Sequence, residues 1–117
     1  MNIAEINKKG EVCSLLTEEV NWKTNLNLRD GKYKVGIRPH NITTYKEGKN
    51  SIEINGKVLI SELSGSESLI HFTNGDLNWV SLSEGIHQKG VGEQTKLFMN
   101  ADEFLYFDNN NQLVGNV

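Results

Sequence analysis

Short runs of alternating apolar and polar residues, each closed by a turn signal, recur along the chain. After Asp30-Gly31, apolar residues occupy every second position up to Pro39, which ends the run because proline cannot donate to a β-ladder. Asn74-Gly75 separates two further alternating runs and predicts a hairpin. Strands separated by turns at intervals of about 8 to 12 residues predict an all-β sandwich or small barrel of short antiparallel strands.

One longer strand is predicted in the middle of the chain. Apolar residues keep the same parity on both sides of Asn55-Gly56, so we expect one bent or bulged strand from Ser51 to about Leu63 instead of a hairpin. No stretch holds a helical period over ten or more residues, and 17–28, which comes closest, is interrupted by asparagines. The other expected elements are a hairpin over 2–17, strands over 68–72, 77–82, 95–99, 104–107 and 113–114, and one helical turn at 100–103.

Composition bounds the class of protein. A chain of 117 residues is the size of one domain, so residues 1–117 are expected to form a single unit. Cys13 is the only cysteine, which excludes an intrachain disulfide and favours a reducing compartment. No segment reads as a signal peptide or approaches the roughly 20 apolar residues of a membrane span.

The charge and the glycine pattern argue against nucleic-acid and nucleotide binding. The net charge of −3 and scattered lysines and arginines do not form the basic surface on which nucleic-acid affinity rests. Gly85 and Gly90 have the spacing of a phosphate loop, but Val91 and Gly92 stand where lysine and a hydroxyl residue are required. We therefore expect no ATP binding by this chain.

Candidate catalytic and metal-binding residues do not form a recognisable constellation. The histidines at 40, 71 and 87 lack the close pairing of zinc ligands, and Ser64 and Ser66 are expected to be turn residues. Acidic side chains are available for a hard cation, but their spacing does not require one. The aromatic residues that a sugar or base would stack on are expected in the core instead: Trp22, Phe72 and Trp79.

Several segments, in order, resemble the regulatory domain of the ATP-binding subunits of maltose-type and glycerol-phosphate-type ABC importers. Val35-Gly36-Ile37-Arg38-Pro39-His40 resembles the Gly-Ile-Arg-Pro-Glu strand end of that domain. Glu62-Leu63-Ser64-Gly65-Ser66-Glu67-Ser68 resembles its Glu-x-Leu-Gly-x-Glu-Thr turn. Val91-Gly92-Glu93, Phe107-Asp108 and the opening Met1-Asn2-Ile3 resemble further segments, so the similarity covers nearly the whole chain.

The resemblance implies an OB-like fold of the TOBE type with little helix. It implies a regulatory and dimerisation role in ATP-driven carbohydrate import, with no catalytic, cofactor or metal site here. ATP and Mg²⁺ would belong to a preceding ATPase domain. Met1 would then be an internal methionine of the longer subunit. Eight positions match the family motifs and are expected to be structural or to form inter-domain contacts: Gly36, Arg38, Pro39, Glu62, Gly65, Glu67, Phe107 and Asp108.

The implied partners are a second copy of the domain, the ATPase domain, the transporter's membrane subunits and regulatory proteins, with no nucleic acid. The implied location is cytoplasmic, at the inner face of the membrane. His40, Ser64 and Leu105 depart from the family pattern, where Glu, Leu and His stand. Arg38 and Glu62 read either as solvated charges or as a pair that fixes two strand ends. The alternative function is a free-standing β-module that binds an oxyanion or oligosaccharide.

Overall fold

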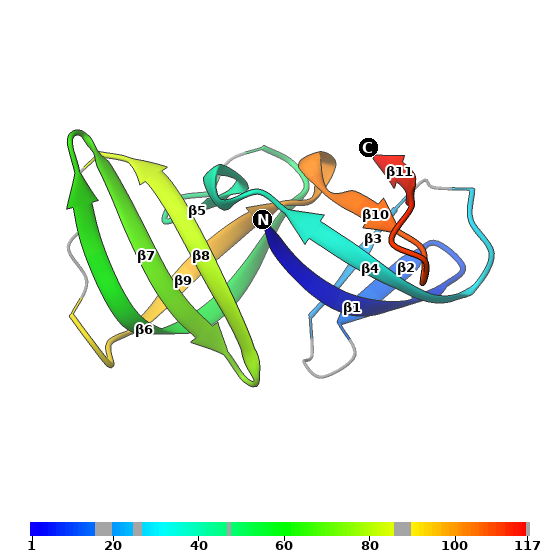
Figure 1. The fold of residues 1–117 in the computed structure, drawn as a ribbon, viewed down its shortest axis with the longest axis horizontal. Helices are drawn as coiled ribbons and strands as arrows, with labels where there is room; N and C mark the ends of the chain where they lie inside the picture. The colour runs from blue at the N-terminus through cyan, green and yellow to red at the C-terminus, as the bar shows by residue number, and fades with distance from the viewer. Residues whose placement is uncertain (16–19, 25–26, 47, 86–89, 117) are drawn as a thin grey trace.

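The chain forms two β-sheets side by side along its longest axis in the computed structural model (Figure 1). Its principal extents are 41 × 25 × 24 Å. The structure describes residues 1–15, 20–24, 27–46, 48–85 and 90–116. Strand accounts for 64% of it and helix for 6%, which confirms the all-β class.

The first sheet has six strands in the order β11-β10-β4-β1-β2-β3. The predicted hairpin at the N-terminus is confirmed for the residues described, because β1 pairs with β2 in antiparallel register. On its other side β1 pairs with β4, and β10 joins β4 from the far end of the sequence. The strands are β1 (Asn2–Lys9), β2 (Val12–Leu15), β3 (Asn21–Lys23), β4 (Gly31–Ile37), β10 (Leu105–Phe107) and β11 (Leu113–Asn116).

The second sheet has five strands in the order β5-β9-β6-β7-β8 and curls into a nearly closed antiparallel barrel, consistent with an OB-like fold. The two ends of the sheet approach each other without a ladder, and a side-chain hydrogen bond from the Ser81 hydroxyl to the Ile42 carbonyl links them. The strands are β5 (Ile42–Thr43), β6 (Ser51–Ser64), β7 (Glu67–Asn74), β8 (Leu77–Glu84) and β9 (Gln94–Asn100).

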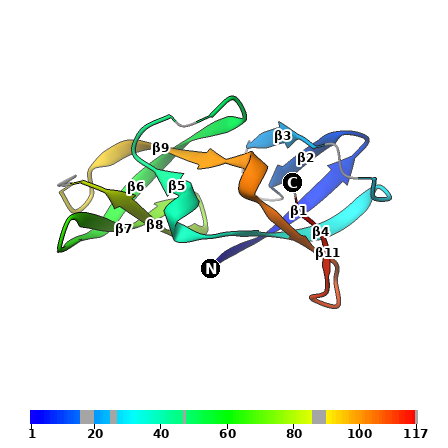
Figure 2. The same cartoon turned by 90° about the horizontal axis from the view of Figure 1, so that it is seen from above.

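Two short turns of 3-10 helix carry the chain between the sheets, as the view from above shows (Figure 2). The turn η1 (Pro39–Asn41) leads from β4 to β5, and η2 (Ala101–Glu103) leads from β9 to β10. The helical turn predicted at 100–103 is therefore confirmed as η2. Its start is capped because the Asn100 side chain accepts a hydrogen bond of 3.1 Å from the Asp102 amide.

The long bent strand predicted in the middle of the chain is confirmed as β6. Gly56 pairs with Thr95 inside the β6–β9 ladder, so Asn55-Gly56 is not a turn. Against β7, the register shifts between Val58 and Ile60, which is the signature of a β-bulge. Because of the bulge, apolar residues two positions apart lie on opposite faces of the strand. Val58 before it is 1% exposed, whereas Ile60 after it is 50% exposed.

The three aromatic residues predicted for the core are buried, with exposed fractions of 7% for Trp22, 0% for Phe72 and 2% for Trp79. Cys13 is also fully buried, and burial raises the pKa of its thiol, against a smaller opposing effect of Lys8. The cysteine therefore packs as a small apolar side chain.

Sequence pattern did not predict β3, β5 or η1. These elements have two or three residues each, too few to show a period. The strand β3 lies within 17–28, the segment whose pattern came closest to a helix, and it exists because it pairs with β2. The ladder partner, not the local sequence, creates the strand.

Candidate functional site

The joint between the two sheets is held by the side chain of Asn2. Its amide nitrogen donates to the Ile37 carbonyl at 3.1 Å and to the Val80 carbonyl at 2.9 Å. Its oxygen accepts from the Val80 amide at 2.8 Å. One side chain, 7% exposed, therefore connects β1 and β4 of the first sheet to β8 of the second.

Gly36 lies beside that joint, where two side chains pass close to its backbone. A Cβ atom at this position would lie 2.9 Å from Met1 Sδ and 2.9 Å from a ring carbon of Phe107. Real Cβ atoms do not approach other atoms this closely, so any other residue would displace these two side chains. Three positions that match the family motifs, Met1, Gly36 and Phe107, are thus in one contact.

Arg38 and Pro39 form the exit from β4. Arg38 is extended, with φ −68° and ψ 143°, and Pro39 occupies the first position of η1, where a missing amide hydrogen costs least. The Arg38 carbonyl accepts from the Asn41 amide at 2.9 Å, which closes the turn. Pro39 therefore ends the β4 ladder as predicted and directs the chain towards the second sheet.

Glu62, Gly65 and Glu67 belong to the β6–β7 hairpin. Gly65 has φ +63° and supplies the left-handed turn residue, whereas Glu62 and Glu67 are exposed on the strands. Within the described residues no ion pair joins Arg38 to Glu62; the ion pairs found there are Lys8–Asp30 and Lys96–Glu53. The hypothesis of a charge-assisted pair between the two strand ends thus gains no support.

Asp108 organises the turn between β10 and β11. Its carboxylate accepts from the amides of Asn110 and Gln112, each at 2.9 Å. Asn111 in this turn has φ 62°, a left-handed conformation that asparagine tolerates better than most residues. The structure brings together Gly36 and Phe107 near the joint, but places Asp108 in a separate turn.

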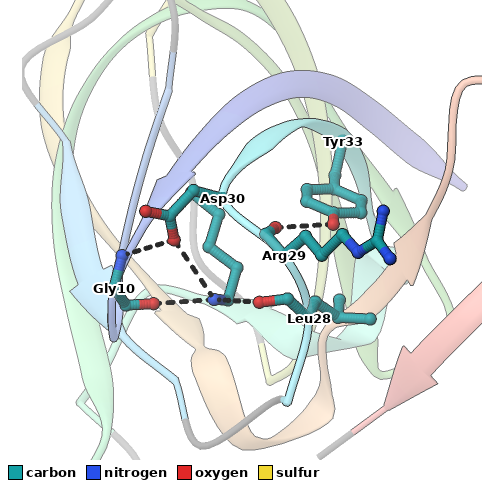
Figure 3. Close-up of polar contacts among 6 residues, drawn as sticks. Gly10, Leu28, Arg29, Asp30 and Tyr33 are labelled. Atoms are coloured by element: carbon teal, nitrogen blue, oxygen red, sulfur yellow. Dashed lines mark hydrogen bonds and ion pairs between the residues drawn. The ribbon is translucent and has the colours of Figure 1, made fainter.

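A buried lysine that the sequence did not single out fixes the β1–β2 end of the first sheet. Lys8 is 5% exposed, and its Nζ donates to the carbonyls of Gly10 and Leu28, each at 2.7 Å. Asp30 Oδ1 lies 4.0 Å from Nζ. It also accepts from the Gly10 amide at 2.8 Å, as Figure 3 shows. A signal was available, because Lys8 has the parity of buried Ile6, which sends its side chain inward.

Histidines and acidic residues do not gather into a metal site in the described part of the chain, where no group of three or more potential ligands occurs. His40 is exposed and His71 is half-buried, and His87 lies outside the described residues. Of the glycine-rich segment from Gly85 to Gly90, the four central residues are likewise outside the described residues.

No helix among the described residues is long and apolar enough to cross a bilayer.

The residues at the joint and in the turns hold the fold by packing and hydrogen bonding. A comparison with models of known protein families gives no match for this chain, and a comparison with curated proteins gives none either.

Proposed function

We propose that this chain is the C-terminal regulatory domain of the ATP-binding subunit of a sugar importer of the maltose or glycerol-phosphate type. The observation that carries the proposal is the position of two family-like segments, Met1–Ile3 and Val35–His40. Asn2 of the first hydrogen-bonds to Ile37 of the second and to Val80 of the other sheet. Two of the segments that resemble the family thus help to set the two sheets against each other.

In this role the domain holds two ATPase subunits together while their nucleotide faces open and close. A two-fold contact uses one surface twice, so modest complementarity suffices. Tethering to the ATPase pair raises the effective concentration, so a weak contact is adequate. ATP and Mg²⁺ act in the preceding domain, and the transporter's membrane subunits place the complex at the cytoplasmic face of the membrane.

Exposed apolar side chains provide two candidate surfaces for this pairing. On β6 they lie at the bulge, and on the first sheet they share the face that carries Phe107. They are Leu59 and Ile60 on β6, and Met1, Ile3 and Leu113 on the first sheet. Leu63 is also exposed, but it lies on the opposite face of β6 from Ile60, because it pairs with buried Ser68 whereas Ile60 pairs with His71.

The test begins with the reading frame upstream of residue 1, which is expected to encode a Walker A motif and an ABC signature. Sedimentation of the chain and of the full subunit should then show self-association, stronger in the full subunit. Ile60→Lys or Ile3→Lys should weaken it, whereas Asn78→Lys, at an exposed position of β8, should not. If deletion of 1–117 from the parent leaves both transport and its regulation unchanged, the proposal fails.

A second candidate, the free-standing ligand-binding module, is favoured by one observation: a hollow beside η1 that is lined by polar side chains. Two carboxylates in this lining oppose an oxyanion, because like charges repel in a confined site. An oligosaccharide is compatible with the lining. Thermal stabilisation by sugars would distinguish this candidate from the regulatory domain.

A further inference from the structure

The outer face of three neighbouring barrel strands, β6, β7 and β8, carries a continuous apolar surface (Figure 1). The ladder register places Ile60, His71 and Val80 in one row across the three strands. Leu69 and Leu82 are directly opposite each other in the next row. These five residues are called the β6–β8 face below.

Burial along β7 shows that the β6–β8 face points away from the barrel interior. Ser68, Ile70 and Phe72 are buried, whereas Leu69 and His71 between them are half-buried. Successive side chains of a strand point to opposite faces, so the half-buried set is the outer one. A contiguous apolar face that remains accessible to solvent marks an interaction site.

One charged residue lies on each side of the row, on the same face of β6. Lys57 and Glu62 are opposite Thr73 and Leu69, each two residues away from the His71 that lies opposite Ile60. Each charge therefore stands about 7 Å from the row along the strand, one on either side of it. Opposite charges at equal distances from an apolar centre form a self-complementary pattern.

These two charges are not paired within the chain. Lys57 and Glu62 are exposed, and the ion pairs found in the described part of the chain involve other residues, Lys8–Asp30 and Lys96–Glu53. Both side chains are therefore available to a partner.

We propose that the β6–β8 face binds the same face of a second copy, about a two-fold axis that runs along the row. Ile60 then faces its counterpart, and Lys57 of each copy faces Glu62 of the other copy. An axis parallel to the strands would place Lys57 opposite Lys57, which is unfavourable. The inference rests on the pairing of two copies in the proposed function and assigns that pairing to one of its two candidate surfaces.

The apolar patch on the first sheet lacks this charge pattern. The charges beside it, Glu5 and Lys34, are directly opposite in the β1–β4 ladder, where unlike charges attract. Lys34 Nζ also donates to Asn111 Oδ1 at 2.8 Å. The charges of this patch are thus balanced within one chain and do not select a second copy.

The size of the β6–β8 face sets the expected strength of the contact. Three strands make a face about 15 Å wide, too small to bury the roughly 800 Å² per partner of a standard stable complex. The isolated chain should therefore dimerise weakly, with a dissociation constant on the order of 0.1 to 1 mM. Tethering in a longer subunit would strengthen the contact through effective concentration.

The first test is sedimentation equilibrium of the 117-residue chain at concentrations up to about 1 mM. Ile60→Lys should weaken self-association about tenfold, because it places two charges in the apolar centre of the contact. Ile3→Lys, an equally exposed position on the first sheet, is the matched control and should leave it unchanged. Unfolding midpoints should be the same for both variants, since neither side chain is in the core.

Two outcomes of this test overturn the inference. One is the absence of self-association by the unchanged chain at about 1 mM. The other is a loss of association with Ile3→Lys but not with Ile60→Lys, which would assign the pairing to the first sheet. In the second case the proposed function stands, and in both cases the upstream reading frame tests it separately.

Charge reversal tests the direction of the axis. Lys57→Glu and Glu62→Lys each place like charges opposite one another, so each should weaken self-association about fivefold. A mixture of the two variants should associate as well as the unchanged chain, because each variant then meets the opposite charge. Lys32→Glu, exposed on the first sheet, is the control for net charge and should change nothing. A mixture that associates no better than its components contradicts the proposed axis.

Discussion

The two tryptophans of this chain are buried alike and bonded differently. Trp22, in the first sheet, donates from Nε1 to the Tyr106 hydroxyl at 2.8 Å and meets the Phe104 ring edge-on at 5.2 Å and 85°. Trp79, in the barrel, has no partner for Nε1 among the described residues. Burial of a large ring follows from apolar pattern, but satisfaction of its N–H depends on a residue distant in sequence.

The same contrast extends to the two sheets. In the first sheet the buried lysine and Asn2 have several hydrogen-bond partners each. Burial raises the pKa of Tyr106, although the hydrogen bond from Trp22 acts in the opposite direction. In the barrel, Trp79 and Ser83 remain unsatisfied within the described part of the chain. Within the described residues, the buried polar side chains of the first sheet are hydrogen-bonded, whereas the barrel contains buried polar atoms that have no partner.

The largest expected effect comes from removing the core ring of the barrel. Trp79→Ala should lower the free energy of unfolding by about 3 to 5 kcal/mol, because a large ring leaves a cavity. Urea unfolding measures this loss. Val91→Ala, at an exposed position outside both candidate pairing surfaces, is the control and should stay within about 0.5 kcal/mol of the original chain. An unchanged midpoint for Trp79→Ala would show that the barrel does not depend on this ring.

Breaking the joint between the sheets should have the next largest effect. Asn2→Ala removes the partners of both backbone groups of Val80. A fully buried group left unpaired costs about 1 to 3 kcal/mol. The two groups are part-buried, so a loss of about 2 to 4 kcal/mol is expected, below the roughly 6 kcal/mol upper limit for two fully buried groups. Asn7→Ala, on the exposed face of the same strand, is the matched control. Equal unfolding midpoints for the two variants would mean that the two sheets are held by other contacts.

The smallest effect sharpens the comparison of the tryptophans. Trp22→Phe and Trp79→Phe remove the same atoms, but within the described part of the chain only the first breaks a hydrogen bond. Trp22→Phe should therefore be more destabilising by about 1 kcal/mol, the net value of an ordinary hydrogen bond. Paired urea unfolding curves measure the difference. A larger loss for Trp79→Phe would indicate that its indole N–H has a partner after all.

Sequence pattern predicted most strands because their side-chain alternation is local. The bulged β6 was predicted from parity alone, and Pro39 marked the end of the β4 ladder. The family-like positions were also read from sequence, and the structure explains Gly36 by the close approach of the Met1 and Phe107 side chains to it. The hollow was not predicted, because His40, Glu67 and Ser83 come from three separate segments that meet only in the fold.

By itself the sequence determined the all-β class, the turns and the buried aromatic residues, since each depends on neighbours a few positions away. Only the tertiary structure decided that two sheets form and that Asn2 joins them. It also decided that Trp22 is hydrogen-bonded whereas Trp79 has no partner among the residues that the structure describes. The reason is physical. Alternation tells which side of a strand is buried, but a hydrogen bond between residues 22 and 106 depends on how the intervening chain brings two strands together.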